Sequence, residues 1–312
     1  MTLHRLDPSP ATCRWGLFDA AFAPVLMVQP GDSVTIATVS GVPAVMPPEG
    51  SPFTPDPRLL QIHAELERAP GHIITGPVAI AGAEPGDMLE VRIEAVEITQ
   101  DWGYCGFRPL AGTLPREFDR PFLTHIPVDR ARGTARLPYG PELQLAPFFG
   151  VMGVAPPPTF GAISTVQPRQ HGGNLDNKEL VAGSTLFLPV WATGALFSCG
   201  DGHGVQGDGE VCINALEIDL AGTFTFVLHK NAALRFPRAE TPTHFISMGL
   251  HEDLDTAMRM ALREMIGFIC SRSELSREQA YQFCSLAVDF RVTQTVNGEK
   301  GIHGMLKRGL LF

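Results

Sequence analysis

Several features that define common classes of protein are missing from this sequence. The six cysteines form no C-x-x-C pair, so neither a paired-cysteine zinc motif nor a disulfide framework is indicated. No apolar run is long enough to span a bilayer, and the N-terminal segment has no apolar signal core. We therefore expect reduced thiols in a cytoplasmic protein that does not enter a membrane.

Positive charge is also scarce, because 24 lysines and arginines stand against 33 acidic residues and give a net charge of −9. Nucleic acids and anionic lipids attract basic surfaces, so we expect neither as a partner. The sequence has no G-K-[ST] phosphate loop and no G-x-S-x-G elbow. A G-x-G-x-x-G match at 202–207 precedes a β-branched segment instead of a helix, which argues against a dinucleotide site.

Glycine and proline are plentiful, at 32 and 27 residues, and short apolar segments lie between them. This pattern is typical of strands separated by turns. We expect strands at 34–41, 72–82 and 88–98. In the last segment apolar and charged residues alternate, which predicts a strand with one buried and one exposed face.

The C-terminal part has a different pattern. Apolar residues in 254–269 fall at helical spacing after Asp253, a possible N-cap. Ser276 and Gln279 fit a capping box for a second helix, and alternation returns at 287–296. We expect a mainly β fold, with a β-rich body at about 1–240 that carries the site and a smaller α+β portion at 241–312.

Residues 194–214, GALFSCGDGHGVQGDGEVCIN, combine many glycines with acids and one histidine. Strand-like apolar runs at 186–197 and 211–220 flank them, so we expect a polar crossing between two buried strands. Asp201 and His203 are two residues apart and would share one face of an extended chain. Asp208 and Glu210 have the same spacing.

A second polar group, in QPRQHGGNLDNKEL, offers His171, Asn174 and Asp176, and His72 precedes a predicted strand. Histidine and carboxylate side chains bind zinc, and a carboxylate can take a proton from an activated water. These residues therefore indicate a metal-dependent hydrolase. Two other interpretations stay open at this stage: Asp and Asn beside glycine commonly form turns, and Cys199 is either a nucleophile or a buried inert thiol.

The motifs HGGNLDNKEL, GSTLFLPV and GALFSCGDGHGVQGDGEV resemble the central signature of the acetamidase/formamidase family. GHIITGPVAIAGAEPGDMLEVRI is similar to the family's N-terminal strand-turn-strand, and SMGLHEDLDTAMRMALREMI is similar to its C-terminal part. The resemblance spans nearly the whole chain in the same order. It implies a β-sandwich-like body, a homo-oligomer, and hydrolysis of small linear amides to ammonia and a carboxylate.

The resemblance also implies a divalent metal, zinc in the first place and calcium as the alternative. By position in the motifs, the implied metal ligands are His72, Asp201, His203 and Asp176. Glu210 of GDGE is the implied general base, with Asp208 beside it as a second catalytic candidate. The residues implied to bind substrate are Asn174, Gln206 and His171.

This chain reads GDGHGVQGDGE where the family pattern reads GDLHAAQGDGE. Gly202 and Gly204 thus replace bulkier residues beside His203, and we expect a larger pocket or a looser loop. Two rival functions from other classes remain. One is an amidase with Cys199 as nucleophile, and the other is a non-catalytic β-sandwich binding protein stabilised by a metal.

Overall fold

The computed structural model describes residues 1–312, and two large sheets dominate it. The larger has nine strands, from edge to edge β1 (Leu3–Leu6), β5 (Ser33–Ala37), β17 (Leu220–His229), β7 (Met88–Ile98), β15 (Thr185–Pro189), β18 (Arg238–Glu240), β19 (His244–His251), β21 (Glu299–Lys307) and β20 (Val288–Asn297). The smaller has six, namely β14 (Gly172–Asn174), β12 (Phe148–Gly153), β16 (Phe197–His203), β6 (Ile73–Ile80), β2 (Cys13–Trp15) and β4 (Leu26–Val28), which also pairs with β6.

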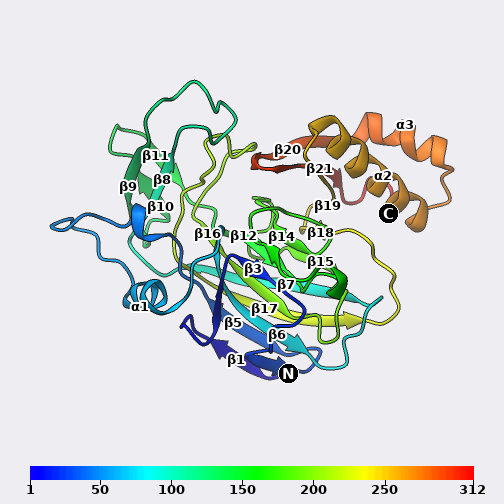
Figure 1. Cartoon of the computed structure of the whole chain (residues 1–312). Coiled ribbons are helices and arrows are strands. Elements are labelled where there is room, and N and C mark those ends of the chain that lie inside the picture. Colours follow the sequence, from blue (N-terminus) through cyan, green and yellow to red (C-terminus); the bar gives the residue numbers. More distant parts are fainter.

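Smaller elements complete the chain (Figure 1). A four-stranded sheet contains β11 (Glu142–Gln144), β10 (Thr134–Arg136), β9 (Phe122–Asp129) and β8 (Trp102–Phe107). A two-stranded sheet contains β13 (Ile163–Ser164) and β3 (Leu17–Phe18). The α-helices are α1 (Pro57–Glu65), α2 (Leu254–Arg272) and α3 (Arg277–Ala287), and the short 3₁₀ helices are η1 (Pro43–Val45) and η2 (Pro158–Phe160).

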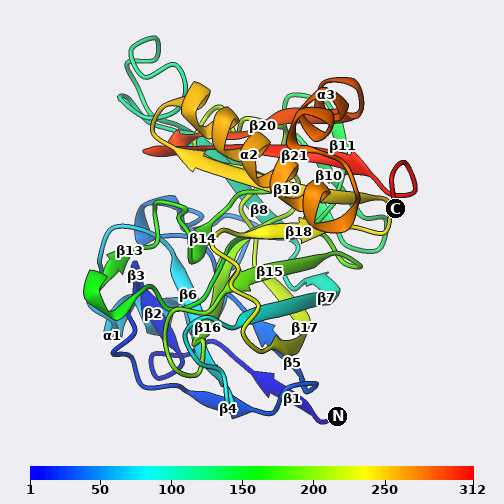
Figure 2. The same ribbon diagram turned by 90° about the vertical axis from the view of Figure 1, so that its right-hand side faces the viewer.

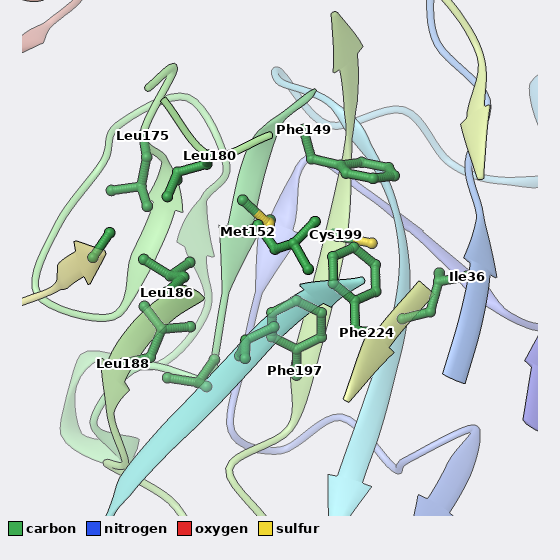
Figure 3. Packing of buried hydrophobic residues seen from close by; sticks show 14 of the residues in the cluster. Ile36, Phe149, Met152, Leu175, Leu180, Leu186, Leu188, Phe197, Cys199 and Phe224 are labelled. Atoms are coloured by element: carbon green, nitrogen blue, oxygen red, sulfur yellow. The ribbon is translucent and has the colours of Figure 1, made fainter. Parts of the chain in front are cut away.

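The main core lies between the nine-stranded and the six-stranded sheets, where 34 buried apolar residues form one cluster. Strand β7 contributes Leu89, Val91 and Ile93, as its alternation predicted. Figure 3 shows side chains from the two sheets meeting face to face, and the ring of Phe224 packs in tilted contact with those of Phe149 and Phe197. Burial of this apolar surface is the main force that holds the two sheets together.

The C-terminal helices cover β19, β20 and β21 at the end of the molecule remote from β1 (Figures 1 and 2). Asp253 caps α2, since its carboxylate accepts from the Thr256 N–H at 2.8 Å. Ser276 and Gln279 form the predicted capping box at the start of α3. The expectation of a mainly β fold with a smaller C-terminal α+β part is confirmed. None of the three α-helices has the length and apolar character needed to cross a bilayer.

Two details of the central stretch differ from the sequence prediction. The polar crossing is itself partly a strand, because β16 runs through Phe197–His203, and the strand expected at 211–220 is mostly irregular until β17 begins at Leu220. The backbone of this irregular segment is bound by other parts of the chain. Glu217 exchanges backbone hydrogen bonds with Tyr104, so tertiary contacts override the local β preference.

The boundary expected near residue 240 falls within the nine-stranded sheet, where β18 and β19 pair as neighbours on either side of it. The division into a body at 1–240 and a portion at 241–312 stays a prediction. The hairpin of β20 and β21, red in Figure 1, extends from beneath the helices toward the rest of the chain.

Replacing Ser276 by alanine tests the contribution of the capping box. The variant loses the oxygen that accepts from the Gln279 N–H at 3.2 Å, and we expect the free energy of unfolding to fall by about 1 kcal/mol. Denaturant unfolding monitored by circular dichroism measures this. Ser271→Ala, at an exposed position within α2, is the matched control and should change stability by less than about 0.5 kcal/mol; equal losses in the two variants would contradict the assignment.

Candidate metal and catalytic site

The site forms where two neighbouring strands depart from regular alternation. In β12, Phe149 and Met152 both point into the main core, whereas Val151 packs in a separate cluster on the other face. The alternation therefore shifts at Gly150, which lies between pairing positions that flank Asp201 on β16. Asp201 itself has a φ of 56°, in the left-handed region that few side chains adopt. This local irregularity directs Asp201 and His203 away from the apolar core.

Asp201 and His203 lie in a cluster of buried acids and imidazoles. The distance from His203 Nε2 to Asp201 Oδ2 is 3.3 Å, and to Glu217 Oε1 it is 3.5 Å. His72, which directly precedes β6, places Nε2 at 3.7 Å from Asp201 Oδ2 and is partly exposed. The cluster thus joins residues that are up to 145 positions apart in sequence (72 to 217), and His72 is its most accessible member.

Two more carboxyl groups complete the cluster. Asp176, in the loop after β14, and Glu210, in the loop after β16, have oxygens that lie with a nitrogen of His203 within 4.8 Å of one another. Both residues are buried and both have positive φ, at 46° and 44°. Backbone strain of this kind costs on the order of 1–3 kcal/mol per residue and concentrates at functional sites. Three of the four acids in the cluster, counting Asp201, therefore sit on strained backbone.

Hydrogen bonds fix some atoms of the cluster and leave others free. Asn297 donates from Nδ2 to Asp176 Oδ2, and the backbone N–H of Ala215 and Nδ2 of Asn214 each donate to Glu217 Oε1 at 3.1 Å. The buried atoms of the cluster with no partner are Asp176 Oδ1, Glu210 Oε2, His72 Nδ1 and both ring nitrogens of His203. A buried polar atom without a partner costs about 1–3 kcal/mol, so this set of free atoms indicates a ligand.

The charges of the cluster are strongly coupled. Burial raises the pKa of Asp176 to about 7, against the opposing effect of the His203 charge. Burial, followed by repulsion from Asp176, raises the pKa of Glu210 well above its ordinary value. Closely spaced buried carboxyl groups cannot all ionise without a counter-charge. The pair of Asp176 and Glu210 therefore holds either a proton or a cation.

His203 and Asp201 shift in the opposite sense. Burial disfavours the imidazolium of His203, but the carboxylates of Glu217 and Asp201 outweigh it and raise its pKa well above the ordinary value. Burial also opposes ionisation of Asp201, and the charges of His72 and His203 reverse this and lower its pKa. The site thus attracts positive charge strongly.

The glycine at position 150 leaves the space that a ligand would need. A methyl group added there would lie 2.6 Å from Asp176 Oδ1, 2.6 Å from Asp201 Oδ2 and 2.8 Å from His203 Cε1. The carboxylate oxygens of Asp176 and Asp201 thus face this space beside the edge of the His203 ring. Carboxylate oxygens together with imidazole nitrogens form a donor set of zinc, whereas calcium takes oxygen ligands only. The residues present therefore fit a divalent cation, and a mixed N/O set fits zinc better.

The structure brings together most of the residues predicted for the site. His72, Asp176, Asp201, His203 and Glu210 meet in the cluster, and Gln206 joins them by donating from Nε2 to the Asp176 carbonyl at 2.8 Å. The Gln206 Oε1 atom is buried and unpartnered. It is an acceptor that a substrate N–H group could use.

Three predicted residues have no described hydrogen bond or ion pair with the cluster. Asp208 is exposed and its carboxylate is 3.2 Å from Lys178 Nζ, so it does not share a face with Glu210. His171 packs edge-on against Phe18 at a ring distance of 5.0 Å, and burial lowers its pKa to about 3. Asn174 donates to the Val166 carbonyl at 3.2 Å. The atoms Asn174 Oδ1 and His171 Nε2 are buried and have no partner, like Gln206 Oε1.

Glu217 is the member of the cluster that sequence reasoning missed. It lies in a segment that reads as an ordinary half-buried strand, ALEIDL, and no motif spacing links it to His203. An isolated β-bridge between the two residues brings them together. The only signal in the sequence was an acid among apolar residues in a stretch otherwise suited to burial.

The structure also places the residues of the rival hypotheses. Cys199 is fully buried in the apolar core, with its sulfur between aromatic rings in Figure 3, and burial raises the pKa of its thiol well above the ordinary value. This environment suits an inert thiol. A side chain on Gly202 would meet the Ile218 carbonyl at 2.2 Å, and one on Gly204 would meet Leu216 at 3.1 Å. Both point toward packed chain, so the expectation that they enlarge a pocket has no support here.

Comparison with known proteins gives a consistent result. The model of the acetamidase/formamidase family matches residues 18–162 and 159–299. An acetamidase from Mycolicibacterium smegmatis is 31% identical over 205 residues, which cover 47% of this chain and 50% of that protein. The chain thus spans about half the length of the curated relatives it matches.

Solved structures match over a longer range. The crystal structure of an acetamidase from Bacillus halodurans is 30% identical, with a TM-score of 0.84 over 97% of both chains. An acetamidase from Yersinia enterocolitica is 27% identical, with a TM-score of 0.86 over 99% of this chain and 93% of that chain. The two-sheet architecture and the C-terminal helical part are therefore shared with these proteins.

Gly150→Ala tests whether the space above β12 receives a cation. The backbone at Gly150 accepts alanine, since its φ is not positive, but the new methyl group would occupy the space between Asp176 and Asp201. We expect the affinity for a divalent metal to fall by at least about tenfold, measured by equilibrium dialysis and metal analysis. Gly207→Ala has open space around the added atom and should bind metal normally. Unchanged metal binding by Gly150→Ala would place the cation elsewhere.

Proposed function

The chain belongs to the acetamidase/formamidase family, and from this premise we propose that it is an amidase that hydrolyses the C–N bond of small linear carboxamides. The products are ammonia and a carboxylate. The observation that carries the proposal is the buried cluster of four carboxyl groups around His203, with unpartnered polar atoms on Asp176, Glu210 and His203. The similarity to proteins named acetamidase and formamidase supports the choice of substrate class.

We assign a divalent cation to this cluster, zinc in the first place and calcium as the alternative. Asp201, His203 and Asp176 would hold it, and His72 adds a ligand at the accessible side. Such an ion polarises a carbonyl group and lowers the pKa of a water molecule. Glu217 Oε1 lies 3.5 Å from the same His203 Nε2 atom that Asp201 Oδ2 approaches, and its hydrogen bonds from Asn214 and Ala215 let it orient the imidazole ring.

Glu210 is the general base. Its Oε2 atom is buried and has no partner, and burial together with the nearby Asp176 carboxylate raises its pKa, which strengthens it as a proton acceptor. It accepts a proton from the attacking water and delivers that proton to the departing nitrogen. Asp208 pairs with Lys178 at the surface, so we assign it no part in proton transfer.

The amide group of the substrate needs partners of its own. Gln206 is held by its bond to the Asp176 carbonyl, and its Oε1 acceptor is buried without a partner, which suits the N–H₂ group of a primary amide. His171 Nε2 and Asn174 Oδ1 are also buried without a partner, so we keep both residues as candidates for binding the substrate. We further propose, from the family resemblance, that the protein is cytoplasmic and forms a homo-oligomer.

Ammonia release from a series of amides tests the proposed function. Metal-stripped protein is assayed with formamide through butyramide and with aromatic amides, with and without added zinc or calcium. Zinc-restored release supports the proposal, and the chain-length profile measures the pocket. Ammonia release that does not depend on metal but is abolished by thiol alkylation would favour Cys199 as the nucleophile. If no ammonia is released and the melting temperature depends on metal, a binding protein is favoured.

Glu210→Gln separates the base from the metal site. We expect the variant to keep its metal content and to lose about 10²-fold or more in kcat, because the amide cannot accept the proton. Ammonia release and metal analysis of the same sample measure both. Asp208→Asn, two residues away in the same motif, is the control and should retain kcat within about threefold. Near-normal turnover by Glu210→Gln would remove Glu210 from the role.

A further inference from the structure

The tip of the β20–β21 hairpin enters the site from the C-terminal part of the chain. Asn297, the last residue of β20, is buried and donates from Nδ2 to Asp176 Oδ2 across 121 positions of sequence. The bond occupies one oxygen of Asp176 and leaves Oδ1 unpartnered. Oδ1 is also the Asp176 atom that faces the space above Gly150.

The hairpin holds Asn297 firmly. Gln294 accepts from the backbone N–H groups of Val296 at 2.9 Å and Asn297 at 3.3 Å, and its Nε2 donates to the Glu299 carbonyl at 2.6 Å. Gly298 closes the turn with a φ of 77°, a conformation that glycine adopts without strain. An asparagine in a tight turn commonly bonds its own backbone, but the Asn297 side chain reaches out of the turn instead.

The same hairpin also holds the loop that carries Glu210. The Gly209 N–H donates to the Thr293 carbonyl at 3.1 Å, and the Thr295 N–H donates to the Gly209 carbonyl at 3.1 Å. Gly209, the residue before Glu210, thus forms a parallel β-bridge with Gln294 of β20. One rigid element therefore contacts both Asp176 and the neighbour of Glu210.

We propose that Asn297 is a positioning residue for cation binding: it fixes the Asp176 carboxylate so that Oδ1 is the oxygen presented to a divalent metal. The inference rests on the metal site of the proposed function. An amide N–H₂ group can only donate, so it selects an acceptor oxygen and restrains the rotation of the carboxylate. Partners of this kind, one step removed from a metal, contribute about 10–100-fold to affinity or activity.

Asn297→Leu tests this inference, because leucine has the same branching at Cγ and lacks the donor. The zinc affinity of the full-length protein is measured by competition with a chromogenic chelator, together with kcat and KM at saturating zinc. We expect the zinc dissociation constant to rise about 10–100-fold and kcat to fall, with KM changed less than kcat. Asn297→Ala gives the same readout if the leucine variant does not fold.

Ser247→Ala is the matched control, since it removes a buried donor to the Ala261 carbonyl in the same C-terminal part, remote from the cluster. It should lower the melting temperature and leave zinc affinity unchanged. If Asn297→Leu behaves like Ser247→Ala, with a lower melting temperature and wild-type zinc affinity, Asn297 is structural and the inference is wrong. If the wild-type protein itself binds no zinc, the proposed metal site fails and this inference fails with it.

Discussion

The structure depends on how four buried carboxyl groups are kept close to one histidine. Ionised groups removed from water are stable only when they are paired, hydrogen-bonded or bound to a cation. His203 offsets part of the negative charge of Asp201 and Glu217, whereas burial raises the pKa of both Asp176 and Glu210, and repulsion from Asp176 raises that of Glu210 further. The arrangement is therefore costly without a cation and well suited to bind one.

The rest of the fold supports this arrangement. The two packed sheets provide a rigid base, and the change in alternation at Gly150 and Asp201 turns polar groups away from the core. The loops after β14 and β16 carry Asp176 and Glu210 to the cluster with strained backbone conformations. Hydrogen bonds with the β20–β21 hairpin hold both loops in place. Parts of the chain that look separate in sequence thus contribute to one site.

The sequence predicted features that depend on interactions between near neighbours in the chain, and missed those that depend on contacts between distant segments. Asp253 and Ser276 could be recognised as caps because a cap bonds only its near neighbours, and Asp201 with His203 could be recognised from their spacing. Glu217 and Asn297 could not, because only a β-bridge and a long-range hydrogen bond bring them to the site. The expectation that Asp208 and Glu210 share one face was wrong, because the loop leaves regular extended geometry at Gly209, where φ is 96°.

The most direct test of the central claim is a crystal structure of zinc-soaked protein, with diffraction data collected on both sides of the zinc absorption edge. The account predicts one strong anomalous peak over Gly150, within ligand distance of Asp176, Asp201 and His203. No peak at the cluster, or a peak only at surface histidines, would contradict it. The buried acids would then be held by shared protons alone.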